Sequence, residues 1–110
     1  MQIKNIVVTI MTAVFMCNTN TNLLNDLYSN LSGFNIPSEE HQKIQNAGGA
    51  STYGEITYES VDKLLKKLTL TQKDVFYDLG CGIGKMVVQI YLNSPAKKCV
   101  GIELSKTRYD

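Results

Sequence analysis

The chain has 110 residues, 44% of them hydrophobic and 19% charged, with a formal net charge of +1 at pH 7. This composition fits one small globular domain, and the weak charge gives no field that would attract nucleic acid. The three cysteines and the single histidine lack the spacing of a metal site or a disulfide framework, so we expect no bound metal.

Residues 1–22 have the pattern of an export signal. Lys4 precedes an almost continuous apolar run from Ile6 to Cys17, and a polar Asn/Thr run follows. The apolar run suits a signal-peptide core and is too short for a membrane-spanning helix. Its cleavage site is poor, so the alternative is a buried strand or helix. We expect a leader with a linker, which favours export, with the cytoplasm as the alternative location.

Residues 23–52 are expected to form a helical N-terminal extension. Leucines and one tyrosine recur at helical spacing over residues 23–31, which predicts an amphipathic helix. Thr21 or Asn22 is its predicted N-cap, because short polar side chains accept hydrogen bonds from the first free backbone N–H groups.

A second, polar helix is predicted over residues 39–46, with Ser38 as its N-cap. Residues 48–51 are small and glycine-rich, and we expect them to connect this helix to Tyr53. A third helix is predicted from the N-cap Thr57 to Leu68, since its apolar residues follow the spacing of a face that packs on a core.

The most informative stretch is the apolar run from Val75 to Leu79, which ends in an acid and a leucine and is followed by glycines at every second position. It predicts a buried parallel strand that leads through a glycine turn into a helix beginning near Lys85. A second short strand over residues 99–104 carries an acid, Glu103, near its carboxyl end. Strand, turn, helix and strand form a βαβ unit, so the fold class is α/β.

Two common phosphate-binding motifs do not fit this turn. A P-loop requires Ser or Thr where Met86 stands and glycine where Leu79 stands. A dinucleotide fingerprint requires glycine where Lys85 stands. The pattern D-x-G-x-G-x-G remains, with Glu103 about 20 residues further on, where an acid can accept both hydroxyls of a ribose. Cys81, which has no histidine near it in sequence, is predicted to be a small turn residue and not a nucleophile.

This pattern resembles class I S-adenosylmethionine-dependent methyltransferases. With Tyr53-Gly54-Glu55 upstream and Val87-Val88-Gln89 downstream, it resembles the Dot-one (disruptor of telomeric silencing) family of histone lysine methyltransferases. The resemblance covers about half of the chain, from Tyr53 to Glu103. It implies that residues 53–110 are the cofactor-binding half of a truncated, Rossmann-like class I methyltransferase domain.

The resemblance also implies which residues surround the cofactor, S-adenosyl-L-methionine. The methionine part would lie among Asp78 and the glycines, Glu103 would hold the ribose, and the loop from Tyr53 would close over the methionine. Where the family often has Thr and Gln, this chain has Ile56 and Lys85. The implied cofactor-binding residues are Tyr53, Gly54, Glu55, Thr57, Asp78, Gly80, Gly82, Gly84, Lys85 and Glu103.

By family analogy, the implied activity is methyl transfer to a protein lysine. No catalytic residue on the acceptor side is identifiable. Two strands of the expected sheet are recognisable, so we expect the N-terminal part of a longer enzyme, with an open sheet edge and an exposed apolar face. The alternatives are an inactive exported remnant that binds no cofactor, and another Rossmann-like nucleotide-binding protein such as a dehydrogenase.

Overall fold

The structure is a computed structural model that describes residues 6–7 and 19–110. The greater part of the predicted leader lies outside the described residues, and export therefore stays a prediction. Within the described residues, no helix has the length and apolar character needed to cross a membrane.

Helices and strands alternate along the second half of the chain, as the βαβ pattern predicts. The elements are β1 (Ile6–Val7), α1 (Thr19–Tyr28), α2 (Ser38–Asn46), α3 (Tyr58–Leu68), β2 (Val75–Leu79), α4 (Lys85–Asn93), β3 (Lys98–Ile102) and α5 (Lys106–Tyr109). The sheet has the order β1-β3-β2, with β2 parallel to β3 and β1 antiparallel to it. Both predicted strands and the helix between them are confirmed, which gives a mixed α/β fold with a parallel pair.

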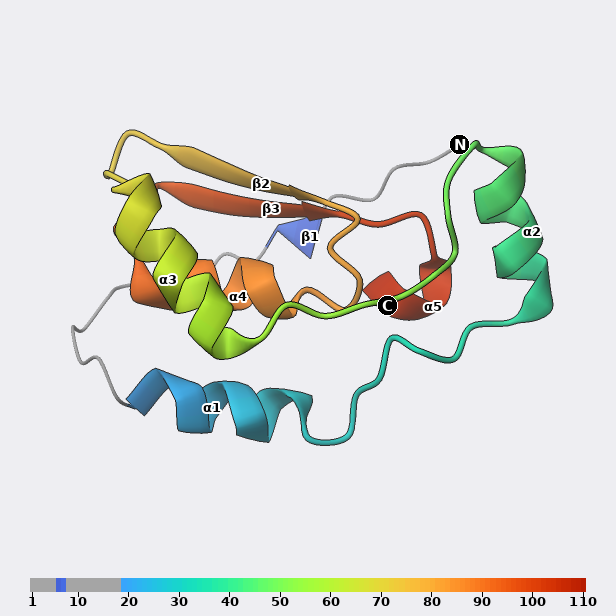
Figure 1. The fold of residues 1–110 in the computed structure, drawn as a ribbon, viewed down its shortest axis with the longest axis horizontal. Helices are drawn as coiled ribbons and strands as arrows, with labels where there is room; N and C mark the ends of the chain where they lie inside the picture. Colours follow the sequence, from blue (N-terminus) through green and yellow to red (C-terminus); the bar gives the residue numbers. More distant parts are fainter. Residues whose placement is uncertain (1–5, 8–18) are drawn as a thin grey trace.

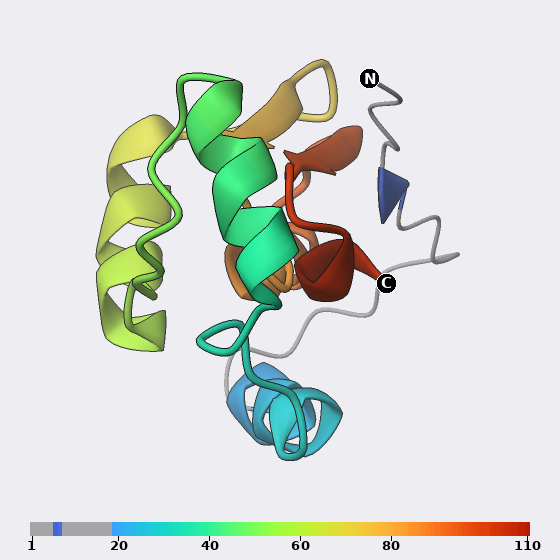
Figure 2. The same cartoon turned by 90° about the vertical axis from the view of Figure 1, so that its right-hand side faces the viewer.

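Helices cover one face of the parallel pair. In Figure 1, α3 and α4 lie below β2 and β3, and α1 lies below α4; the turned view in Figure 2 also places α1 farthest from the sheet. Helix α4 packs on the strands because its Val87 and Ile90 face them and are almost fully buried. The buried core consists of Val61, Cys81, Val87, Ile90 and Cys99.

The opposite face of β2 is uncovered. Val75, Tyr77 and Leu79 alternate along the strand and are 40%, 59% and 76% exposed. Alternate residues of a strand point to opposite faces, so these three side chains share the face that the helices do not cover. The predicted exposed apolar face is confirmed at β2, whereas Val100 of β3, which pairs with Tyr77, is only 3% exposed.

Helix α3 begins and ends as the sequence predicts. The side chain of Thr57 accepts a hydrogen bond from the Ser60 N–H at 3.2 Å, which confirms Thr57 as the N-cap. The helix ends at Leu68, and Thr69 follows in the left-handed region with φ of 50°.

The predicted N-caps of the two preceding helices are wrong. Helix α1 begins at Thr19, so Thr21 and Asn22 lie inside it. Residues 19–22 are all polar, and the sequence pattern does not choose among several possible caps. Helix α2 begins at Ser38 itself, after Pro37, whose φ of −59° already suits a helix start; no side chain caps it.

Short helix α5 was not predicted. Ser105 is its N-cap, with its side chain accepting a hydrogen bond from the Arg108 N–H at 3.3 Å. Four residues are too few to show the apolar periodicity from which α1, α3 and α4 were predicted.

Candidate functional site

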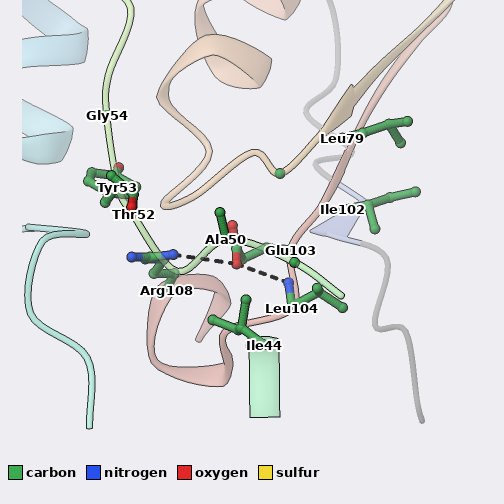
Figure 3. Close-up of a pocket in the computed structure, with 12 residues that line it drawn as sticks. Ile44, Ala50, Thr52, Tyr53, Gly54, Leu79, Ile102, Glu103, Leu104 and Arg108 are labelled. Carbon is green, nitrogen blue, oxygen red and sulfur yellow. Dashed lines mark hydrogen bonds and ion pairs between the residues drawn. The ribbon is translucent and has the colours of Figure 1, made fainter. Parts of the chain in front are cut away.

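A cavity of about 350 Å³ opens where the carboxyl ends of β2 and β3 meet. In Figure 1, α2 and α5 lie beyond this end of the strands, and Figure 3 shows the cavity with its surrounding side chains. Ligands of open α/β sheets bind at the carboxyl ends of the strands, so this position is the expected one. The lining residues are Ile44, Gly49, Ala50, Thr52, Tyr53, Gly54, Leu79, Gly80, Ile102, Glu103, Leu104 and Arg108.

The glycine turn after β2 is tied to the end of β3. The N–H groups of Gly80 and Cys81 donate hydrogen bonds to the Ile102 carbonyl oxygen at 2.7 and 3.0 Å. Gly80, Gly82 and Gly84 all have positive φ, of 86°, 57° and 83°, a region that residues with a Cβ rarely adopt. The spacing of the glycines therefore follows from the backbone path of the turn.

Glu103 joins the two strand ends through its side chain. Its Oε2 accepts a hydrogen bond from the Gly82 N–H at 2.9 Å, and its Oε1 accepts from the N–H groups of Leu104 and Ser105 at 2.9 and 2.8 Å. Arg108 Nη1 lies 3.9 Å from Oε1. A carboxylate that is only 9% exposed needs such partners, because burial without them is costly. Figure 3 shows Glu103 between Arg108 and Leu104.

Tyr53 packs its ring directly on the glycine turn. A Cβ on Gly82 would lie 2.4 Å from the ring, and one on Gly33 would lie 2.2 Å from it, so the ring fits between two residues that lack side chains. Phe34 contacts the ring edge-on, with centroids 4.9 Å apart. The hydroxyl donates to Glu55 Oε1 at 2.9 Å, and burial together with this bond raises the pKa of Tyr53 to about 12.

Glu55 links the Tyr53 loop to helix α4. Its second oxygen accepts a hydrogen bond from Lys85 Nζ at 2.6 Å, and both side chains are about one-quarter exposed. The Lys85 ammonium also lies 5.8 Å from the centre of the Tyr28 ring, within range of a cation–π contact. Lys85, which departs from the family pattern, thus pairs with the acid of the Tyr53-Gly54-Glu55 motif.

Asp78 in β2 and Cys81 in the glycine turn lie in a desolvated environment. Burial raises the pKa of Asp78, and the nearby charge of Glu103 raises it further. Burial, with the charges of Asp78 and Glu103, raises the pKa of the Cys81 thiol to about 11. A thiol with so high a pKa is a poor nucleophile, in agreement with the prediction of a turn residue.

The structure brings the sequence-predicted residues together around the turn, although not all of them line the cavity. Tyr53, Gly54, Gly80 and Glu103 line it. Gly82 and Glu55 contact these residues, and Lys85 contacts Glu55. Thr57 caps α3, and Gly84 immediately precedes α4. The residues outside the lining are Glu55, Thr57, Asp78, Gly82, Gly84 and Lys85.

Several residues that line the cavity were not predicted from the sequence. Ile44 is the buried apolar residue of the otherwise polar helix α2, and its position as an isolated apolar residue could have identified it. Gly49 and Ala50, predicted as connector, line the cavity, as does Leu104 beside Glu103. Arg108 comes from α5 and reaches the cavity through tertiary packing alone, so no local pattern could reveal it.

No group of three or more His, Cys, Asp or Glu side chains within the described residues could hold a metal ion. The cavity lining combines glycine backbone, apolar side chains, the ring of Tyr53 and the Glu103–Arg108 charge pair. The chemistry that it offers is binding of a ligand through hydrogen bonds and shape.

The comparison with known families agrees with this arrangement. The sequence profile of the family described as "Histone methylation protein DOT1" matches residues 34–109, which include every residue that lines the cavity. The chain belongs to the DOT1 family. The resemblance of the sequence to the Dot-one family is thereby confirmed.

Comparison with individual curated proteins agrees with the family profile. This chain is 46% identical over 55 residues to "Histone-lysine N-methyltransferase, H3 lysine-79 specific" of Drosophila melanogaster, and 42% identical over 57 residues to the protein so named in Caenorhabditis elegans. It is 35% identical over 48 residues to "Protein-lysine N-methyltransferase" of Saccharolobus islandicus. No solved structure matches the chain significantly.

These matches cover a small part of each relative. They span 50%, 52% and 44% of this chain, but 3%, 6% and 30% of the fly, nematode and archaeal proteins, respectively. The similarity thus concerns one segment of proteins that are considerably longer than the matched region.

Proposed function

We propose that this chain carries the S-adenosylmethionine-binding part of a protein lysine methyltransferase with a class I, Rossmann-like core. The observation that carries the proposal is Glu103, whose carboxylate at the end of β3 is held by the Gly82 N–H and faces the cavity next to the Tyr53 loop. An acid in this position of a βαβ unit accepts the hydroxyls of a ribose. Membership of the DOT1 family supports the same ligand.

The described cavity has the properties that such a ligand requires. Its volume of about 350 Å³ lies within the usual range of small-molecule sites, roughly 300–1,000 Å³. Each oxygen of a carboxylate has two lone pairs, so Glu103 Oε2 can accept a hydroxyl in addition to the Gly82 N–H. A Cβ at Gly80 or Gly54 would meet nothing within 4 Å, which leaves open space beside the cavity backbone.

Each group of the chain has a distinct role in this proposal. Glu103 would hold the ribose, Gly80 would allow close approach of the ligand to the backbone, and Tyr53 and Gly54 would cover the methionine part. When bound, S-adenosylmethionine supplies a methyl group on a positively charged sulfur. The chain contributes alignment and exclusion of water, and positioning of this kind can lower a barrier by roughly 7–11 kcal/mol.

We propose a protein lysine as the methyl acceptor. The names of the fly, nematode and archaeal relatives all specify lysine methylation of a protein. A lysine must lose its proton before it attacks, and a desolvated channel lowers its pKa. We identify no such channel among the described residues, and we propose that the acceptor site is completed in the whole enzyme.

Isothermal titration of S-adenosylhomocysteine and of NAD into the full chain tests the ligand. We expect binding of the first and none of the second. Gly54→Phe should abolish binding, because Gly54 lines the cavity and a Cβ there would meet nothing within 4 Å, which leaves room for the ring to enter the ligand's space. Gln45→Phe, which adds the same ring at an exposed position of α2 outside the cavity lining, is the matched control.

Three outcomes would contradict the proposal: NAD binding, equal affinity in Gly54→Phe, or no binding by a chain whose circular dichroism shows it to be folded. The last result would favour the alternative of an inactive remnant. Methyl transfer from labelled S-adenosylmethionine to histone H3 and to intact nucleosomes would then test the acceptor separately.

A further inference from the structure

Arg108 is the only arginine in the sequence, and it is buried. It lies in the four-residue helix α5, is 7% exposed and lines the cavity. A buried guanidinium is retained at low cost only when several acceptors surround it. Its partners therefore indicate what it holds together.

The guanidinium joins two loops that are distant in sequence. Its Nε–H donates a hydrogen bond to the Gly33 carbonyl oxygen at 2.9 Å, and its Nη2 donates to the Ser51 carbonyl oxygen at 3.0 Å. Gly33 lies between α1 and α2, and Ser51 lies two residues before Tyr53. Both acceptors are backbone groups, so the contacts fix the course of the loops and not merely their side chains.

The same group lies against the two side chains that shape the cavity. Its central carbon is 4.7 Å from the centroid of the Tyr53 ring, and Nη1 is 3.9 Å from Glu103 Oε1. The Arg108 and Glu103 side chains are 5% and 7% exposed, so this pair is weakly screened by water. Figure 3 shows Arg108 beside Tyr53 and Glu103 at one side of the cavity.

We propose that Arg108 is the positioning residue that holds the Tyr53 loop and Glu103 in binding geometry before the ligand arrives. The inference rests on the proposed function, because it concerns the same cavity. Only a planar guanidinium can donate in two directions and still stack on a ring; a lysine ammonium cannot replace it. An ordered loop lowers the entropy that binding would otherwise cost.

The first test needs no variant. Since the chain has one arginine, its Nε–H gives a single identifiable signal in a ¹H–¹⁵N spectrum of the full-length, ligand-free protein. We expect this proton to exchange with water about tenfold or more slowly than in an unstructured peptide, with a nuclear Overhauser contact to the Tyr53 ring. Exchange at the unstructured rate, without that contact, would overturn the proposal.

The second test compares Arg108→Lys with Lys106→Met, a change on the same helix at an exposed residue. In Arg108→Lys, amide exchange of residues 51–57 should accelerate about tenfold, while that of β2 and β3 stays at the parental rate. Affinity for S-adenosylhomocysteine should fall about tenfold. Lys106→Met should match the parent in both measurements.

The outcomes separate positioning from other roles. Uniformly faster exchange throughout Arg108→Lys would show a merely structural residue, and parental exchange with parental affinity would show no role; either result overturns the proposal. If the parent binds no S-adenosylhomocysteine, the proposed function fails, but exchange in residues 51–57 still decides the positioning. If Arg108→Lys does not fold, the Nε–H signal of the parent decides.

Discussion

Buried charges in this protein are paired across elements that lie far apart in sequence. Glu103 accepts backbone hydrogen bonds from the glycine turn, and Arg108 donates to carbonyl groups of two loops. Glu103 and Arg108 also form a buried charge pair. Removing either side chain would leave the other charge buried and uncompensated, at a typical cost of about 3–5 kcal/mol. Single residues at the cavity therefore support both the fold and the proposed binding geometry.

A second acid, Glu40 of α2, makes comparable hydrogen bonds between α2 and α5. It accepts hydrogen bonds from the Ser105 hydroxyl and from the Thr107 hydroxyl and N–H, which lie at the start of α5. Desolvation alone would raise the pKa of Glu40, but the hydrogen bonds from Ser105 and Thr107 outweigh it and lower the pKa. Because the folded-state pKa is lowered, the stabilisation is present above the unfolded-state pKa and is lost as pH falls.

We expect Glu40→Gln to lower the free energy of unfolding by about 0.5–1.5 kcal/mol near neutral pH, the usual net contribution of a hydrogen bond. Since hydrogen bonding lowers the pKa of Glu40, the difference from the parent should shrink as pH falls below the unfolded-state pKa and through the lower folded-state pKa. Urea unfolding at several pH values measures both effects. Glu39→Gln, at the exposed neighbouring position, is the control, and a pH-independent difference would contradict the prediction.

At the scale of elements, local signals set the helices and strands of the second half of the chain. Thr57 caps α3, the apolar spacing of α4 packs it on the sheet, and the glycines carry the turn. The C-terminal end of α3 is not optimal for stability, because Thr69 adopts a left-handed conformation with φ of 50° and ψ of 51°. A β-branched residue is strained there, and glycine is the usual residue at this position.

Thr69→Gly should therefore stabilise the protein. Relief of the strained conformation, about 1–2 kcal/mol for a residue with a Cβ, exceeds the entropy cost of a new glycine, so we expect a gain of about 0.5–1 kcal/mol. Urea unfolding followed by circular dichroism measures it. Thr71→Gly should instead destabilise, because it removes the Thr71 hydroxyl that donates a hydrogen bond to Asp74 Oδ2. A loss of stability in Thr69→Gly would contradict the prediction.

At the scale of the whole molecule, the face of β2 that points away from the helices is exposed. Parallel strands are normally covered on both faces, and Val75, Tyr77 and Leu79 make the bare face of β2 apolar. An exposed apolar strand is a site of association between copies or with other proteins.

Tyr77→Lys should reduce self-association without changing the fold, because a charge on this face opposes its burial. Sedimentation velocity over a range of protein concentrations should show less association than in the parent. Leu68→Lys makes the same kind of change on α3, where Leu68 is 42% exposed, and should behave like the parent. Equal association in both variants would show that the β2 face is not responsible.

The sequence by itself determined β2, α4 and β3 and the family to which the chain belongs. The alternation and spacing of apolar residues predicted β2, α4 and β3, and the positions of Tyr53, Gly80 and Glu103 predicted a ligand site at the strand ends. These signals are local, because hydrogen-bonding periodicity and the freedom of glycine act within a few residues. The family comparison agrees with what these residues predicted.

Tertiary structure alone decided which side chains meet. It placed Arg108 against Tyr53 and Glu103, paired Lys85 with Glu55, and brought Ile44 of α2 to the cavity. No pattern within one element predicts such contacts, because they depend on the relative placement of segments tens of residues apart. Burial then gives them their importance, since a charge removed from water must find its partners in the protein.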